Sequence, residues 1–284
     1  MEAHIGSPLF FCIFVKSQNS TFNIQHSTFN IQHSTFNIQH STLIQKVAGI
    51  VIDTVKHSDR HNIVTLFARE QGRVSLLSSA GGGKTARMRN SALMPLSVIS
   101  ADINFNATRE LQFLGKFQRD IVWRDLYFSP AKSAVAMFIT EFLSSYMRQS
   151  PPDPMLWDFT VRAIGQLDAA DSAAYVANFH LAFLIEFLDY AGIRPDLSAW
   201  REDGWFDMRG GTVSIMPPAH RDVIVPRQMH TLRLLGRMNL RTAALFRFKK
   251  EERRELLGAL LHYYSLHFPG LGNLKSPSVL TVLM

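Results

Sequence analysis

The sequence is poor in cysteine and has no apolar run long enough to cross a membrane. Cys12 is the one cysteine in 284 residues, so the chain lacks a partner for an internal disulfide and the thiolates of a zinc site. The longest apolar run near the start, LFFCIFV at 9–15, falls short of the roughly 20 residues of a membrane span. Glu2 precedes this run and no clean small-residue cleavage site follows, which argues against a signal peptide. These absences indicate a cytoplasmic protein without a thiolate-bound metal.

The chain does contain enough apolar material for sizeable cores, together with an excess of positive charge. Hydrophobic residues make up 46% and charged residues 19% of the sequence, and the formal net charge is +7. The length suggests two domains at about 150 residues each. A basic balance of this size favours a polyanionic partner, either nucleic acid or an anionic membrane surface.

The N-terminal region contains a perfect short repeat that fits no regular structure. Residues 20–40 read STFNIQH three times, and a fourth copy stops at Thr42. Phe and Ile lie two residues apart in each copy, which rules out a heptad seam, and an odd period changes the buried face of a strand at every copy. We expect residues 1–42 to be a non-native or disordered extension, with the folded protein beginning near Leu43. The alternative is an Asn/Gln-rich tail that is prone to aggregation.

Five short strand-like runs follow the repeat. They alternate apolar and polar residues or are rich in β-branched residues, and turns such as EQGR, centred on Gly72, separate them. The runs lie at 46–55, 61–70, 73–79, 93–105 and 109–117. Five strands in so short a stretch predict a closed β-barrel of the OB type over residues 43–120.

Beyond residue 120 the apolar period becomes helical. The predicted helices cover 129–147, 153–168, 172–192, 227–238 and 248–268. Val176, Phe179, Phe183 and Phe187 form a stripe at spacings of three and four, which is typical of a core face. A Gly-rich insert near 193–225 is expected to have little regular structure. The fold class is therefore α+β: an OB-type barrel followed by an all-helical domain over 121–284.

The stretch AGGGKTARMRN at 80–90 raises the question of a phosphate-binding loop of an ATPase. That loop needs a first glycine five residues before Gly83, where this chain has Ser78, and a helix that begins at the lysine. Pro95 and a strand-like run follow soon after, so we do not expect that helix. The remaining interpretations are a flexible basic loop that grips a nucleic-acid backbone and a solvated loop without a partner.

Several patches, in this order along the chain, resemble the RecO family of bacterial recombination mediators. The first is GIVIDTVKHSDRHNIVTLFAREQGRVSLLSSAGGGKTARM, in which Ser58, Asp59, Arg60, Thr65, Leu66, Phe67 and Gly72 match the family pattern. The second is AGIRPDL, with Gly192, Pro195, Asp196 and Leu197. The third is LLHYYSLHFPGLGNLKSPSVL near the C-terminus. The resemblance extends from about Leu43 to Met284.

The resemblance implies a non-enzymatic mediator of recombinational DNA repair. Such a protein binds single- and double-stranded DNA and anneals complementary strands. With RecR it helps to load RecA onto DNA that is coated by single-stranded DNA-binding protein, whose acidic C-terminal tail it contacts. The resemblance also implies a cytoplasmic, nucleoid-associated protein of bacteria. The body of the chain contains no G-x-S-x-G motif, no H-E-x-x-H motif and no Cys–His pair, so the sequence suggests no catalytic site.

One departure concerns zinc, because many family members carry four zinc-binding cysteines in the insert. Here the matching stretch, SAWREDGWFDMRGGTVSIM, has none, and Trp200 and Asp203 stand about where the first pair would be. We therefore expect no structural zinc and an insert held by packing of Trp200, Trp205 and Phe206. His220 and His230 are too sparse for a metal site, and the acids Asp196, Glu202 and Asp203 suit a solvated loop.

Cations of the barrel region are the candidate DNA contacts. They are Arg60, Arg69, Arg73, Lys84, Arg87, Arg89, Lys116 and Arg119. Phe67, Phe105 and Phe113 are candidates for base stacking, although the alternating pattern around Phe67 favours a core position. The mixed charges of 249–255 read as a salt-bridged solvent face.

The acidic tail would need a basic-rimmed apolar pocket, for which Arg233, Arg237 and Arg241 are rim candidates. Two other functions stay open from the sequence. One is a basic adaptor that binds acidic tails without binding DNA directly, and the other is a nucleotide hydrolase that uses GGGKT.

Overall fold

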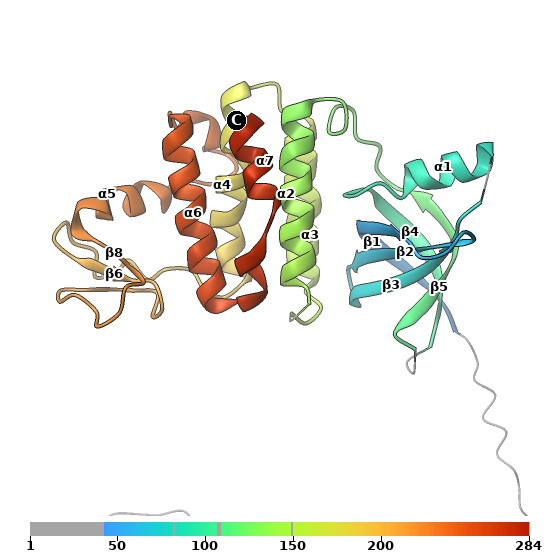
Figure 1. Ribbon diagram of the computed structural model, residues 1–284, viewed down its shortest axis with the longest axis horizontal. Helices are drawn as coiled ribbons and strands as arrows, with labels where there is room; N and C mark the ends of the chain where they lie inside the picture. Colours follow the sequence, from blue (N-terminus) through green and yellow to red (C-terminus); the bar gives the residue numbers. More distant parts are fainter. Residues whose placement is uncertain (1–42, 82, 107–108, 149, 284) are drawn as a thin grey trace, which may run out of the picture. The chain divides into compact units, whose positions relative to one another are not determined.

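Five strands close into the barrel that the sequence predicts. The computed structural model describes residues 43–81, 83–106, 109–148 and 150–283, so the repeat segment 1–42 and Cys12 lie outside the described residues. The strands are β1 (Leu43–Lys56), β2 (His61–Ala68), β3 (Gly72–Ser79), β4 (Val98–Phe105) and β5 (Leu111–Arg119). Their order around the barrel is β1-β2-β3-β5-β4, closed by parallel pairing of β3 with β5 (Figure 1). This OB-type topology confirms the predicted fold class.

The barrel interior follows from the alternation of side chains along each strand. Val64, Leu66, Val74 and Leu76 of the β2–β3 hairpin are buried in one apolar cluster, while the intervening residues of β3 are more exposed. Since neighbouring side chains of a strand point to opposite faces, one strand can fill the barrel and also present a face to its surroundings.

A helix occupies the stretch for which we predicted a flexible loop, so that prediction is wrong. Helix α1 (Lys84–Ala92) begins at the lysine of GGGKT, directly after Gly83, whose φ of 87° suits glycine. One argument against an ATP site therefore fails, because a helix does begin at that lysine. The argument from Ser78 remains: this residue is buried at the end of β3, within a mainly antiparallel barrel and not a parallel α/β sheet.

The helical part begins with three capped helices whose bounds agree closely with those expected. These are α2 (Pro130–Tyr146), α3 (Pro154–Asp168) and α4 (Ala173–Tyr190). Ser129, Asp153 and Ser172 accept backbone N–H groups at their N-termini, as expected for N-cap residues. The predicted stripe on α4 is buried, with Phe179, Phe183 and Phe187 fully inside the core.

The C-terminal elements partly correct the sequence-based expectation. Helices α5 (Pro226–Leu235) and α6 (Lys250–His267) match predicted helices, whereas α7 (Ser276–Leu283) was not predicted. Short 3-10 turns lie at η1 (Ala243–Leu245) and η2 (Pro269–Asn273). The insert is more regular than expected: β6 (Trp205–Asp207), β7 (Thr212–Ser214) and β8 (Val223–Ile224) form a small antiparallel sheet in the order β7-β6-β8.

The barrel and the helices share one core. Ile50, Ile52, Phe67 and Val98 point out of the barrel and belong to the same buried cluster as the side chains of α2 to α4. Two indole groups fasten the contact. Trp157 of α3 donates to the carbonyl oxygen of Phe67, and Trp123 donates to that of Leu96, both at 2.9 Å. The expected boundary near residue 120 therefore lies next to an extensive packed interface.

Asp168, at the end of α3, holds the segment that leads from the barrel into α2. Its carboxylate accepts the backbone N–H groups of Arg124, Asp125 and Leu126 at 2.8–2.9 Å. Burial raises the pKa of the Asp168 carboxyl, but these three hydrogen bonds and the charge of Lys132 outweigh that effect and hold the pKa below its ordinary value.

We expect Asp168→Asn to destabilise the protein at neutral pH by about 1–3 kcal/mol, because an amide cannot replace a charged acceptor of three N–H groups. A depressed pKa contributes stability that is present above the unfolded value of about 3.9 and is lost as the pH falls through the folded value. The free-energy gap between variant and wild type should therefore narrow below about pH 4. Urea titrations followed by circular dichroism, at neutral pH and below about pH 4, measure this difference in unfolding free energy. Asp171→Asn, an exposed change, is the control. A difference that stays the same at both pH values would contradict a depressed pKa for Asp168.

Candidate nucleic-acid interface

A row of apolar side chains crosses the outer face of the barrel on β2, β3 and β5. The register pairs Ile63 with Leu77 and Leu77 with Phe113. Phe113 is 49% exposed, which is unusual for an aromatic ring in a closed barrel. Strands 2 and 3 form the ligand-binding face of OB folds, and the exposed ring of Phe113 on the neighbouring strand β5 can stack on a base.

Two loops flank this row at opposite ends of β3. Arg60 lies exposed in the β1–β2 turn, where its carbonyl accepts the N–H of Ala80 at 2.7 Å. Arg109 lies exposed in the β4–β5 loop. Buried Gln112 holds that loop by donating to the carbonyls of Asn106 and Arg109. Arg109 is not among the cations predicted from the sequence. Its position between the fourth and fifth strands of an OB fold is the signal that identifies it as a candidate.

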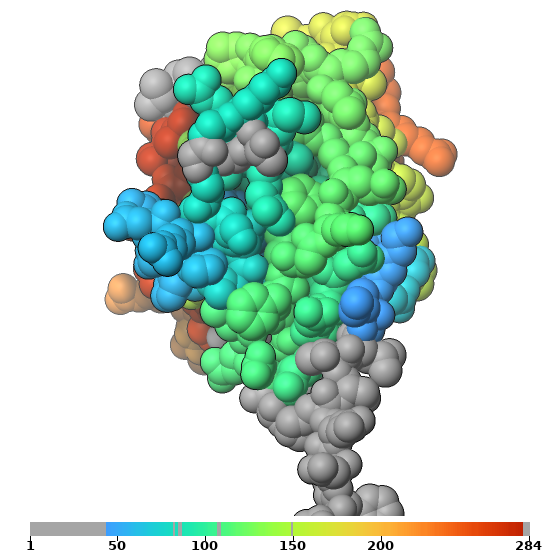
Figure 2. Space-filling view, turned by 90° about the vertical axis from the view of Figure 1, so that its right-hand side faces the viewer, coloured from blue at the N-terminus to red at the C-terminus, as the bar shows by residue number. Residues whose placement is uncertain are grey.

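Basic side chains continue from β5 onto α1. Lys116 on β5 and Lys84 and Arg87 on α1 are exposed. Two other predicted candidates hold the helix in place: the guanidinium of Arg89 lies 5.3 Å from the ring centre of Phe117, and Arg119 donates to the carbonyl of Ser91. Figure 2 shows α1, the β1–β2 turn and β5 on one face of the molecule. The exposed ring of Phe113 and the exposed cations of the barrel region are together called the barrel face below; these cations are Arg60, Arg73, Lys84, Arg87, Arg109 and Lys116.

Arg69 is placed differently from the other candidates. Its guanidinium donates to both carboxylate oxygens of Asp158 on α3, at 3.0 and 2.8 Å, and to Glu70 at 2.5 Å. These hydrogen bonds raise the pKa of Arg69 further above its already high ordinary value. The charge is thus neutralised at the contact between barrel and helices, whereas Arg73, two residues into β3, stays exposed.

The three arginines predicted to meet the acidic tail have different surroundings. The guanidinium of Arg233 lies 4.4 Å from the ring centre of Trp200, and Arg241 is exposed on the turn before η1. Arg237 lines a hollow that we call the arginine hollow. Its other lining residues are Leu234, Thr242, Leu245, Phe246, Arg247 and Phe248. The rings of Phe246 and Phe248 in its lining are stacked, with centres 5.7 Å apart.

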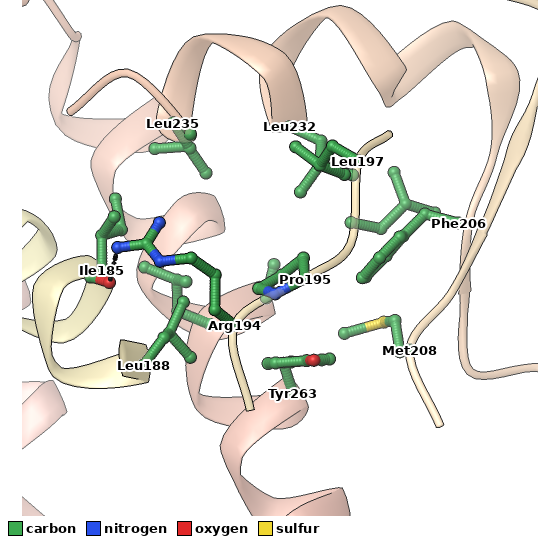
Figure 3. Close-up of a pocket in the computed structure, with 14 residues that line it drawn as sticks. Ile185, Leu188, Arg194, Pro195, Leu197, Phe206, Met208, Leu232, Leu235 and Tyr263 are labelled. Carbon is green, nitrogen blue, oxygen red and sulfur yellow. Dashed lines mark hydrogen bonds between the residues drawn. The ribbon is translucent and has the colours of Figure 1, made fainter. Parts of the chain in front are cut away.

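A second, more enclosed cavity lies between the insert, α4, α5 and α6 (Figure 3). Its volume is about 70 Å³, and its lining is apolar except for Arg194 and the hydroxyl group of Tyr263. That guanidinium donates to the carbonyl of Ile185 at 3.1 Å and to the carboxylate of Asp189 at 2.6 Å. Because the charge of Arg194 is already paired, this cavity favours apolar groups over acids.

Polar contacts and packing hold the insert without cysteine. Phe206 is buried as expected, and Trp200 and Trp205 are half-buried. Two carboxylate–histidine contacts add to the packing, from His220 to Asp207 at 3.2 Å and from His262 of α6 to Asp222 at 2.9 Å. In the part of the chain that the structure describes, no group of three or more His, Cys, Asp or Glu side chains is arranged to hold a metal ion.

The acids of the insert lie in solvated positions, as expected. Arg201 forms an ion pair with Asp203, and Asp196 accepts the backbone N–H of Ser198. Asp196, Glu202 and Asp203 are all exposed. Within the described ranges, no helix is both long enough and apolar enough to cross a membrane.

These features define a class of protein, an OB-type barrel with an aromatic, basic outer face joined to a helical bundle. Two family descriptions match the same two parts: "Recombination protein O N terminal" matches residues 43–118, and "Recombination protein O C terminal" matches residues 128–277. The chain belongs to the RecO family of DNA repair proteins, which confirms the resemblance found in the sequence.

Relatives named DNA repair protein RecO agree over most of their length. The protein of Phocaeicola vulgatus is 32% identical over 241 residues, which cover 85% of this chain and 99% of the relative. That of Porphyromonas gingivalis is 32% identical over 238 residues, or 82% of this chain and 96% of the relative. A more distant one, from Flavobacterium psychrophilum, is 25% identical over 237 residues, or 83% and 97%.

We expect Arg69→Ala and Arg73→Ala to have opposite effects. Loss of Arg69 should lower the thermal midpoint and leave DNA affinity unchanged, because it removes an ion pair between barrel and helices. Loss of Arg73 should weaken DNA binding without changing the midpoint. Thermal melts of Arg69→Ala, Asp158→Ala and the double variant give the coupling between the pair. Strictly additive effects of the two substitutions would show that the ion pair does not contribute to stability.

Proposed function

We propose that this protein is a non-enzymatic DNA-binding mediator of recombinational repair, with the barrel face as its DNA site. The observation that carries the proposal is the exposed ring of Phe113 with cations on both sides of it. The ring stacks on a base of single-stranded DNA, and Arg60, Arg73 and Arg109 contact phosphates near the strand face. Membership of a DNA repair family supports this assignment.

Lys84, Arg87 and Lys116 extend the DNA path from β5 onto α1. Residues of a strand advance about 3.3 Å each, so Lys116 lies on the order of 10 Å from Phe113, within reach of the neighbouring nucleotides. Neutralising the phosphates of two strands on such a surface brings the strands together without bond chemistry, and this suits annealing. Delivery of RecA onto coated DNA, together with RecR, is the role that the family indicates.

Fluorescence anisotropy of labelled single-stranded DNA across a salt series tests this site. Phe113→Ala should weaken binding by about 5- to 150-fold, the equivalent of 1–3 kcal/mol for one stacked base. The triple variant Lys84→Glu, Arg87→Glu, Lys116→Glu should lower the slope of log K against log salt by about 2, or 0.7 for each phosphate contact. Arg254→Glu, an exposed change on α6, is the matched control. A slope that is flat in the wild type, or no binding at low salt, would favour the adaptor that binds acidic tails alone.

We further propose that the arginine hollow receives the acidic tail of single-stranded DNA-binding protein. Arg237 and Arg247 would pair with carboxylates at its rim, while Leu245, Phe246 and Phe248 would pack against apolar residues of the tail. Exposed Leu245 supports an apolar partner at this site.

We expect the double variant Arg237→Glu, Arg247→Glu to abolish binding of a fluorescent peptide with the sequence of that acidic tail, since like charges would then face each other. Arg254→Glu should bind the peptide normally. Titration of both variants by anisotropy measures the difference, and single-stranded DNA affinity should stay unchanged in the double variant. Unaltered peptide binding by the double variant would exclude the arginine hollow.

A further inference from the structure

The row of outer side chains that contains Phe113 continues beyond that ring. The register pairs Phe113 of β5 with Asn104 of β4, and Asn104 with Ile44 of β1. Directly opposite residues of neighbouring strands point to the same face of a sheet. The row therefore has one member from each strand of the barrel, in the order Ile63, Leu77, Phe113, Asn104 and Ile44.

The adjacent row of side chains points into the barrel and so fixes the orientation of this one. Ile103 and Leu114 are paired across β4 and β5, and both are buried in the barrel core. Successive side chains of a strand alternate between its two faces, so Asn104 and Phe113 point outward. Their exposure agrees, because Asn104 is exposed, and Phe113 and Ile44 are 49% and 67% exposed.

Asn104 is the polar member of this row. In the part of the chain that the structure describes, its side-chain amide takes part in no hydrogen bond or ion pair. An amide offers an acceptor oxygen next to a nitrogen with two donor hydrogens. Ligand sites are typically apolar surfaces on which a few polar groups fix orientation and provide specificity. Asn104, between the exposed side chains of Phe113 and Ile44, is placed to be such a group.

The spacing of the strands lets this amide reach a base that lies on Phe113. The Cβ atoms of directly opposite residues are about 4.5–5.5 Å apart, and a purine is wider than a phenyl ring. The edge of a purine stacked on Phe113 therefore comes within hydrogen-bonding reach of Asn104. Ile44, at the same spacing on the far side of Asn104, can contact a neighbouring base.

The charges around Asn104 are compatible with a nucleic acid. The acid nearest along β4 is Asp102, and its cross-strand partner on β1 is Lys46, which balances its charge. Arg109, in the loop that follows β4, is exposed and can contact a phosphate.

Annealing restricts which edge of the base Asn104 can use. The Watson–Crick edge must stay free for the complementary strand, whereas the major-groove edge of a purine stays available in a base pair. On that edge adenine presents the N7 acceptor and a hydrogen of its N6 amino group, which an Asn amide matches with two hydrogen bonds. Guanine presents two acceptors there, and pyrimidines have no N7.

We propose that Asn104 is a specificity-determining residue of the barrel face, which binds an adenine stacked on Phe113 and leaves its pairing edge free. The amide nitrogen of Asn104 donates to N7, and the amide oxygen accepts from the N6 amino group. The inference rests on the proposed function, because it assumes single-stranded DNA on Phe113. It adds a base preference to a surface whose cations contact the phosphates of any sequence.

Anisotropy with three labelled oligonucleotides tests this preference. One contains thymine alone, the second has a single central adenine, and the third has 7-deazaadenine there, which lacks N7 and keeps the pairing edge. The wild type should bind the adenine oligonucleotide about fivefold more tightly than the 7-deazaadenine one, the lower limit for a bidentate contact. Asn104→Ala should bind these two equally and the thymine oligonucleotide as the wild type does. Asn273→Ala, an exposed change on η2, is the matched control and should keep the preference.

Phe113→Ala separates failure of the site from failure of the base preference. This variant should bind all three oligonucleotides more weakly than the wild type. If its affinities are unchanged, the barrel face is not the DNA site and the role of Asn104 is overturned with it. If Phe113→Ala binds weakly but the wild type does not distinguish adenine from 7-deazaadenine, the base preference alone is overturned. A preference for adenine that persists in Asn104→Ala would also overturn it.

Discussion

The contact of the outer wall of the barrel with α2 and α3 determines how the rest of the molecule is used. Apolar side chains that point out of β1, β2 and β4 are buried in the helical core. The indoles of Trp157 and Trp123 satisfy backbone carbonyls at that contact. A buried carbonyl without a donor is costly, so these two bonds specify where the helices can lie. They leave the β3–β5 side of the barrel open, and this is where Phe113 and its neighbouring cations lie.

Contacts between elements divide the basic residues into those that hold the structure together and those that stay exposed. Arg69 pairs with Asp158 on α3, and Arg89 and Arg119 fasten α1 to β5. Arg73, Lys84, Arg87 and Lys116 remain exposed. The net charge of +7 therefore includes cations that are already paired within the protein. The affinity for a polyanion depends on the number of unpaired cations that lie on one face.

The insert is a small sheet held by packing and by ion pairs. Three short strands bury Phe206 against the helical core. Asp207 and Asp222 form contacts with His220, Arg209 and His262 around the sheet. Hydrogen bonds from Arg209 and His262 and the nearby charges depress the pKa of the Asp222 carboxyl, so it stays ionised at neutral pH. Packing and ion pairs thus hold the three short strands together.

The sequence by itself determined the barrel strands, the capped helices and the Phe stripe of α4, because these depend on local periodicity and capping. It also indicated the family, whose patches are local motifs. It could not predict α1, whose polar sequence is held on β5 by Arg89 and Arg119, nor the insert sheet, whose strands are too short for a periodic signal. It counted Arg69 with the free cations, since Asp158 lies 89 residues further along the chain. Only the tertiary structure decided which charges are paired and which face is open, because both follow from contacts between segments distant in sequence.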